Sequence, residues 1–122
     1  MKARCIHIFI AAGMAFPAAA LAKDDLARAI DAYERSHYAE SVRLLRPAAQ
    51  GGNLRAQEML GFMHLYGAAL YGAEVPRDPD QARYWLERAA ASGSSVATRG
   101  LQWIKGQPAP TDGSIGVRSR SE

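Results

Sequence analysis

Cysteine is almost absent from this chain of 122 residues, and the one cysteine, Cys5, lies in an N-terminal segment that we expect to be removed. The remainder then has no disulfide bonds, so its stability must come from packing. Aromatic residues interleaved with blocks of positive charge are also lacking, which argues against a nucleic-acid partner. No segment offers the roughly 20 apolar residues, unbroken by proline, that a membrane-spanning helix needs.

The N-terminal segment 1–22 has the three parts of a secretory signal peptide. Lys2 and Arg4 give it a positive start, an apolar stretch follows, and Ala20-Leu21-Ala22 has the A-x-A pattern of a cleavage site. The alternative is an uncleaved membrane anchor, which the break at Pro17 disfavours. We therefore expect cleavage, a remainder that is close to neutral and not stably inserted in a membrane, and a periplasmic or secreted location in a bacterium.

Groups that could perform catalysis are scarce in the remainder. Only His37 and His64 could act as imidazole bases, and each is better explained as structural or solvated. Motifs of the HExxH, CxxC, GxSxG and phosphate-loop types do not occur. Asp78 and Asp80 suggest a metal pair, but Asp78 is explained as a helix N-cap. We therefore expect no enzymatic activity, no catalytic or metal-binding residue and no cofactor.

The chain repeats itself with a constant offset of 41 positions. Segment 41–60, SVRLLRPAAQGGNLRAQEML, aligns with segment 82–101, ARYWLERAAASGSSVATRGL. Gly52 aligns with Gly93 in this register. Self-similarity at a fixed period is the sequence signature of a repeat architecture, in which each unit buries its apolar face only against its neighbours.

Apolar residues at helical spacing predict about five helices, and no period-two alternation predicts a strand. We expect residues 23–106 to form an all-α domain, a short α-solenoid of antiparallel helix pairs. Segment 107–122 lacks a periodic apolar face and is predicted to be a disordered tail. Helices are expected to begin after the capping acids Asp24-Asp25 and after N-caps at Asn53, Asp78 and either Ser94 or Ser95. Helices are expected to end at the glycines Gly51-Gly52 and Gly93.

Three motifs resemble the short tetratricopeptide-like units called Sel-one-like repeats. They are LGFM from Leu60, VPRD from Val75 and ARYWLERAAASG from Ala82. The resemblance covers one full unit and degenerate flanking units, and it implies paired helices and a role in protein–protein contact. The family pattern has tyrosine where this chain has His64 and glycine where it has Glu74.

A doubled phrase, LYGAA followed by LYGAE, occupies residues 65–74. It lengthens the spacing from Leu60 to Asp78 by five residues relative to the family pattern, so we interpret it as an insertion between the two helices of one unit. A tolerated slip of the sequence is one explanation. A decorated binding surface is the other, because the phrase places two Leu-Tyr pairs in a segment expected to be exposed.

The resemblance to tetratricopeptide grooves implies a concave surface built from the first helix of each unit. We therefore expect a scaffold or adaptor module that binds a protein or peptide, with the oligomeric state left open. The alternative is an envelope structural protein that binds cell-wall glycan or associates with its own copy. Trp103, the counterpart of Phe62, could cap the solenoid or contact a partner. The predicted partner-binding residues are Arg55, Glu58, Phe62, Leu65, Tyr66, Leu70 and Tyr71.

Overall fold

The computed structural model describes the backbone of residues 18–107 and the side chains of residues 23–107. This range contains six helices and no strand, which confirms the all-α prediction. The expected number of five helices is wrong by one, because the doubled phrase forms a short helix of its own. Residues 1–17 and 108–122, from the predicted signal peptide and tail, lie outside the described residues. The helices are α1 (Ala18–Glu34), α2 (Tyr38–Gln50), α3 (Leu54–Tyr66), α4 (Ala68–Tyr71), α5 (Pro79–Ala91) and α6 (Ser95–Gly106).

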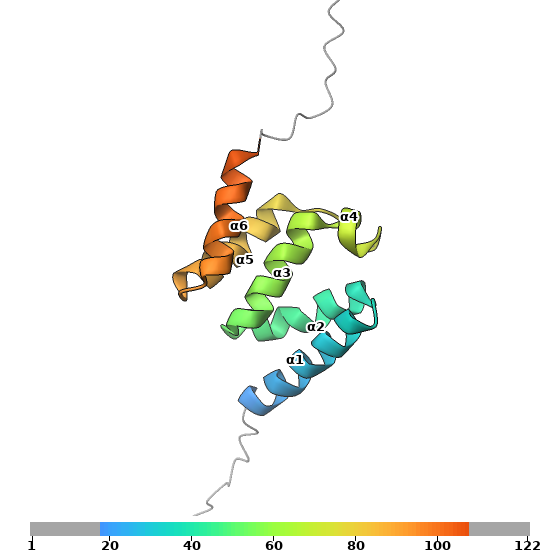
Figure 1. The fold of residues 1–122 in the computed structure, drawn as a ribbon. Helices are drawn as coiled ribbons and strands as arrows, with labels where there is room; N and C mark the ends of the chain where they lie inside the picture. The colour runs from blue at the N-terminus through green and yellow to red at the C-terminus, as the bar shows by residue number, and fades with distance from the viewer. Residues whose placement is uncertain (1–17, 108–122) are drawn as a thin grey trace, which may run out of the picture.

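The long helices pack against one another in chain order. α1 packs on α2, α2 on α3, α3 on α5 and α5 on α6, and α6 also touches α3. Figure 1 shows α3 in the middle of the molecule, with the α1–α2 pair on one side and α5 and α6 on the other. α1, α3 and α6 are thus the first helices of successive pairs, while α2 and α5 are second helices. This arrangement is the predicted short helical solenoid.

Small residues fill the places where the helices cross. In α3, an added Cβ at Gly61 would lie 2.6 Å from Leu86 Cδ2 of α5, so only glycine permits this close approach. Trp85 is buried. One buried cluster joins the first two units and a second joins α3, α5 and α6. The first consists of Ala29, Leu44, Leu45, Ala48, Ala49, Ala56, Leu60, Met63, Val75 and Trp85, and the second of Leu65, Ala82, Leu86, Ala89 and Ala97.

The 41-residue offset reappears in the geometry of the helix starts. Asn53 Oδ1 and Ser94 Oγ, which are 41 positions apart, each accept a hydrogen bond from the backbone N–H three residues later, at 2.9 Å and 3.0 Å. The glycines before them, Gly52 and Gly93, have φ of +92° and +95°, a conformation that glycine adopts without strain. The two units therefore begin their first helices in the same way.

Asp78 caps the start of α5 as predicted, whereas Asp24 and Asp25 do not cap α1. The Asp78 carboxylate accepts a hydrogen bond from Gln81 N at 3.1 Å at the start of α5. α1 begins at Ala18, so Asp24 and Asp25 lie within the helix and the prediction that they cap it is wrong. Because the alanine-rich residues before Lys23 are good helix formers, the helix extends through the two acids.

Replacing Ser94 by alanine is expected to lower the free energy of unfolding by about 1–2 kcal/mol, measured by urea denaturation. The variant loses the α6 cap and the hydrogen bond that Ser94 Oγ donates to Glu58 Oε1. Ser95→Ala is the matched control, because Ser95 is exposed at the first position of α6 and should change stability by less than about 0.5 kcal/mol. Equal losses in the two variants would contradict the assignment of the cap to Ser94.

Candidate functional site

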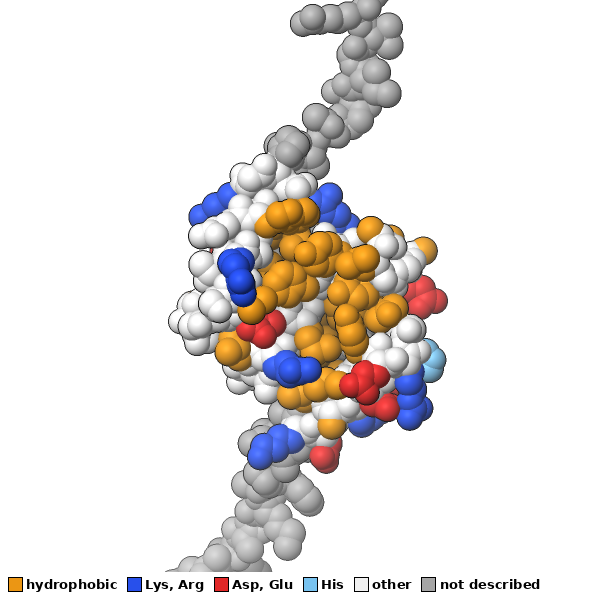
Figure 2. Space-filling model, in the orientation of Figure 1, with side chains coloured by type: hydrophobic (Ala, Val, Ile, Leu, Met, Phe, Trp, Pro, Cys, Tyr) orange, Lys and Arg blue, Asp and Glu red, His pale blue; other side chains and the backbone are white. Residues whose placement is uncertain are grey.

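A groove of about 410 Å³ opens on the face formed by the first helices of the units. Figure 2 shows hydrophobic side chains gathered on this face, with charged side chains around them. α1, α3 and α6 all contribute residues, and α4 adds one at its end. The groove is lined by Ile30, Tyr33, Glu34, Arg55, Glu58, Met59, Phe62, Met63, Tyr71 and Val96.

Four of the seven predicted partner-binding residues line this groove: Arg55, Glu58, Phe62 and Tyr71. Arg55 is exposed, and the other three are partly buried. Glu58 accepts a short hydrogen bond from Ser94 at the start of α6. This bond links α3 to α6 next to the groove. The structure thus places Arg55, Glu58 and Phe62 of α3 on one surface with Tyr71 of α4.

The other three predicted residues lie elsewhere. Tyr66 and Leu70 are exposed beside the groove without lining it. Leu65 is only 2% exposed and belongs to the second buried cluster, so the expectation that it is exposed for a partner is wrong. α3 continues to Tyr66, which places Leu65 one turn after Gly61, on the helix face that packs against α5.

Sequence reasoning missed several lining residues, although two signals could have found them. Val96 lies 41 positions after Arg55, so the repeat offset itself assigns it to the same surface. Ile30 and Tyr33 are three residues apart on α1, which is the first helix of its pair, as α3 is of the next. The missed residues are Ile30, Tyr33, Glu34, Met59, Met63 and Val96.

The doubled phrase forms two successive helix ends. Leu65-Tyr66 ends α3 before Gly67, which has φ of +51°, and Leu70-Tyr71 ends α4 before Gly72, which has φ of +80°. Each copy therefore supplies a glycine that leaves the right-handed helical region. The two copies are then used differently: the first leucine is core and the second is exposed.

Tyr71 of the second copy anchors the insertion to the first unit. Its ring lies 5.9 Å from that of Tyr33 and 5.0 Å from that of Tyr38, in tilted and edge-to-face arrangements. The hydroxyls of Tyr71 and Tyr33 are 3.4 Å apart. Burial, followed by this hydrogen bond, raises the pKa of Tyr71. The insertion thus closes one end of the groove with an aromatic wall.

A second aromatic group lies next to the groove. The ring of Tyr66 stacks on Phe62 at 6.3 Å and lies 6.1 Å from the ring of Trp103 on α6. Trp103 is 44% exposed, so it contacts α3 through Tyr66 and also presents surface to solvent. Aromatic side chains with exposed area are enriched in protein–protein interfaces.

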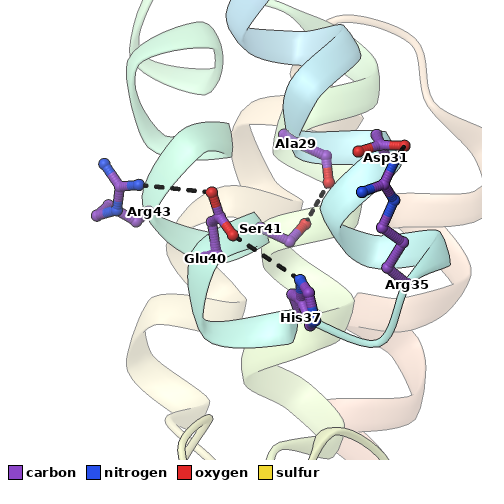
Figure 3. Close-up of polar contacts among 7 residues, drawn as sticks. All are labelled: Ala29, Asp31, Arg35, His37, Glu40, Ser41 and Arg43. Carbon is purple, nitrogen blue, oxygen red and sulfur yellow. Dashed lines mark hydrogen bonds and ion pairs between the residues drawn. The ribbon is translucent and has the colours of Figure 1, made fainter.

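Polar groups at the turn between α1 and α2 have structural roles (Figure 3). Ser41 Oγ donates a buried hydrogen bond of 2.8 Å to the carbonyl of Ala29 and so joins the two helices. Glu40 lies 3.9 Å from Arg43 and 4.0 Å from His37, all of them solvent-exposed, and such pairs contribute little stability. His37 is the N-cap residue of α2 and is exposed. None of these groups lines the groove.

His64 is buried on α3, and neither of its ring nitrogens has a hydrogen-bond partner within the described residues. Burial lowers the pKa of His64 in the folded chain, and Arg46 adds to this effect, whereas Asp78 opposes it. The unfolded chain, with a histidine pKa near 6.5, binds the proton more readily. His64 protonation therefore does not change the free energy of unfolding above about pH 6.5, and it destabilises the fold as the pH falls below that value.

As the pH falls below about 6.5, we expect the free energy of unfolding to fall through His64, with a slope of at most about 1.4 kcal/mol per pH unit. Urea denaturation at several pH values measures this slope. His64→Phe should flatten it, because the variant has no titratable group at this buried position. The assignment fails if the slope survives in His64→Phe.

The comparisons with known proteins add one family match. Residues 54–94 match the family model described as Sel1 repeat. No curated protein and no solved structure matches the chain. Among the described residues, no helix has both the length and the apolar character to cross a membrane, and no three potential metal ligands lie together.

The matched segment coincides with one structural unit. It begins at the first residue of α3, includes the inserted α4, and ends at Ser94, just after α5. Sel1 repeats in general are non-catalytic modules that mediate contacts between proteins. The groove residues of α3 belong to this segment, while α1 and α6 flank it. Residues 54–94 of the chain therefore match one Sel1 repeat, which is formed by α3, α4 and α5.

Proposed function

We propose that this protein is an adaptor that binds a segment of another protein in the groove between α1, α3 and α6. The observation that carries the proposal is the convergence of three first helices on one apolar surface with charged groups at its edge. The groove volume of about 410 Å³ lies in the range typical of binding sites, near its lower end. It suits a few anchoring side chains better than a large flat interface.

The lining residues are of the kinds that favour binding. Tyr33, Phe62 and Tyr71 provide large apolar contact areas, and tyrosine and phenylalanine are enriched in interfaces. Met59 and Met63 have adaptable side chains that fit differently shaped apolar groups. The core beneath the groove holds the helices in place, so binding would not require them to be ordered first.

Photo-cross-linking in the native cell envelope tests this proposal. A photoreactive amino acid replaces Arg55 on α3, which lines the groove, and in a second chain it replaces Arg83, which is exposed on α5 and does not line it. We expect a discrete protein adduct from position 55 and none from position 83. Adducts of equal yield at both positions, or none at position 55, would rule out the groove as the binding surface.

We also propose that the protein acts outside the cytoplasm, in the periplasm or the surrounding medium of a bacterium. The charged start, apolar stretch and A-x-A site of segment 1–22 support this location. Intact-mass measurement of the protein from cell fractions tests it. We expect a chain that begins at Lys23 in the periplasmic or medium fraction, and a full-length chain in the cytoplasm would overturn the proposal.

A further inference from the structure

The charged side chains that line the groove include more negative than positive groups. Two carboxylates, those of Glu34 and Glu58, stand against one guanidinium, that of Arg55. Within residues 23–107, neither Glu34 nor Arg55 forms an ion pair. Glu34 is the last residue of α1, where the helix dipole is negative and favours a nearby cation. A matching occupant would present apolar side chains followed by a positive charge.

The chain itself contains such a sequence. Residues 115–120 read Ile-Gly-Val-Arg-Ser-Arg, two β-branched apolar residues followed by two arginines. The segment lies outside the described residues, in the part predicted to be a tail. Its pattern complements the groove in both respects, since Ile115 and Val117 match the apolar lining and the arginines match the carboxylates.

The connection to this segment is long enough to reach the groove. Ile115 lies eight positions after Gln107, and eight extended residues span about 26–29 Å. The return distance from Gln107 along α6 to Val96, which lines the groove, is about 17 Å at the helical rise per residue. The segment can therefore contact the groove of its own chain.

We propose that residues 115–120 bind in the groove of the same chain, with Ile115 and Val117 against its apolar lining and an arginine paired with Glu34 or Glu58. A segment tethered by a short linker has an effective concentration in the millimolar range. An intrinsic Kd of about 1 mM is then enough to keep the groove occupied about half of the time. The segment would compete with a partner, and only this consequence rests on the proposed function.

Paramagnetic NMR on the full chain tests the proposal. A nitroxide is attached to Ser119→Cys in a chain that also carries Cys5→Ser. We expect the amide signals of Tyr33, Met59 and Val96 to lose at least half of their intensity, while that of Arg83 on α5 keeps most of it. In the matched chain with Ile115→Ser and Val117→Ser, the selective loss at the groove should disappear.

Three results would overturn the proposal: no selective loss, the same loss in the matched chain, or a loss transferred to an unlabelled chain in a mixture, which would indicate binding between copies. The cross-link at position 55 separates this test from that of the function. If residues 115–120 bind in the groove but no partner adduct forms, the proposed function is wrong and this inference holds. If the adduct forms without docking, only this inference fails. If both hold, the Ile115→Ser, Val117→Ser chain should give at least twofold more adduct.

Discussion

Gly67→Ala is expected to lower the free energy of unfolding by about 2–6 kcal/mol. Gly67 has φ of +51° and ψ of −136°, a conformation that costs a residue with a side chain about 1–3 kcal/mol. An added Cβ would also lie 2.2 Å from the backbone nitrogen of Arg77, so the loop before α5 must shift. Overpacking of this kind costs about another 1–3 kcal/mol. Urea denaturation followed by helical circular dichroism measures the loss.

The second copy of the phrase provides the control for this prediction. Gly72 also has a positive φ, of +80°, but a Cβ added there would meet nothing within 4 Å. Gly72→Ala should therefore show the conformational cost alone, about 1–3 kcal/mol. Equal losses at the two glycines would show that the contact between Gly67 and Arg77 does not limit the substitution.

Leu65→Ala is expected to destabilise the protein by about 2–4 kcal/mol, the usual range for removing a buried leucine side chain. Leu65 is 2% exposed among the residues that join α3, α5 and α6. Leu70, at the same place in the second copy, is 60% exposed, so Leu70→Ala should change stability by less than about 0.5 kcal/mol. Thermal unfolding resolves the difference, because 1 kcal/mol corresponds to about 4–8 °C in a domain of this size. A larger loss at Leu70 than at Leu65 would refute the placement of the two copies.

Together these variants address why the phrase occurs twice. Each copy ends a helix with a glycine, so the duplication adds one short helix, α4, between the two helices of the unit. The first copy keeps the core contact of Leu65, and the second contributes Tyr71, which packs on Tyr33 and Tyr38. The insertion is therefore integrated into the fold and shapes one end of the groove.

The features predicted correctly from the sequence are those determined by local chemistry. The N-caps at Asn53 and Asp78, and the left-handed glycine at Gly93, depend only on a few neighbouring residues. The solenoid follows from the 41-residue offset, because equivalent residues must make equivalent packing contacts. Arg55 and Glu58, which the resemblance to tetratricopeptide grooves assigned to the concave surface, line the groove.

The features predicted wrongly depend on where a helix stops and which face it buries. Leu65 was expected to be exposed as part of an insertion between the two helices of the unit, whereas it lies on the buried face of α3, which continues through Tyr66. Tyr71 was expected to be exposed with it, but its ring meets those of Tyr33 and Tyr38, which lie far from it in the sequence. Such a contact depends on how two units are placed relative to each other, which local spacing does not reveal. The start of α1 at Ala18 likewise reflects the propensity of residues before the expected boundary.

The most direct test of the groove as the binding surface is the yield of the partner adduct from a photoreactive residue at position 55 when the groove itself is changed. Val96→Asp places a charge in the groove at a side chain that is 44% exposed, and Leu70→Asp places the same charge at an exposed leucine outside it. Both variants should fold. We predict that Val96→Asp lowers the adduct yield at least fivefold and that Leu70→Asp leaves it unchanged. Unchanged yield in Val96→Asp, or an equal loss in both variants, would contradict binding in the groove.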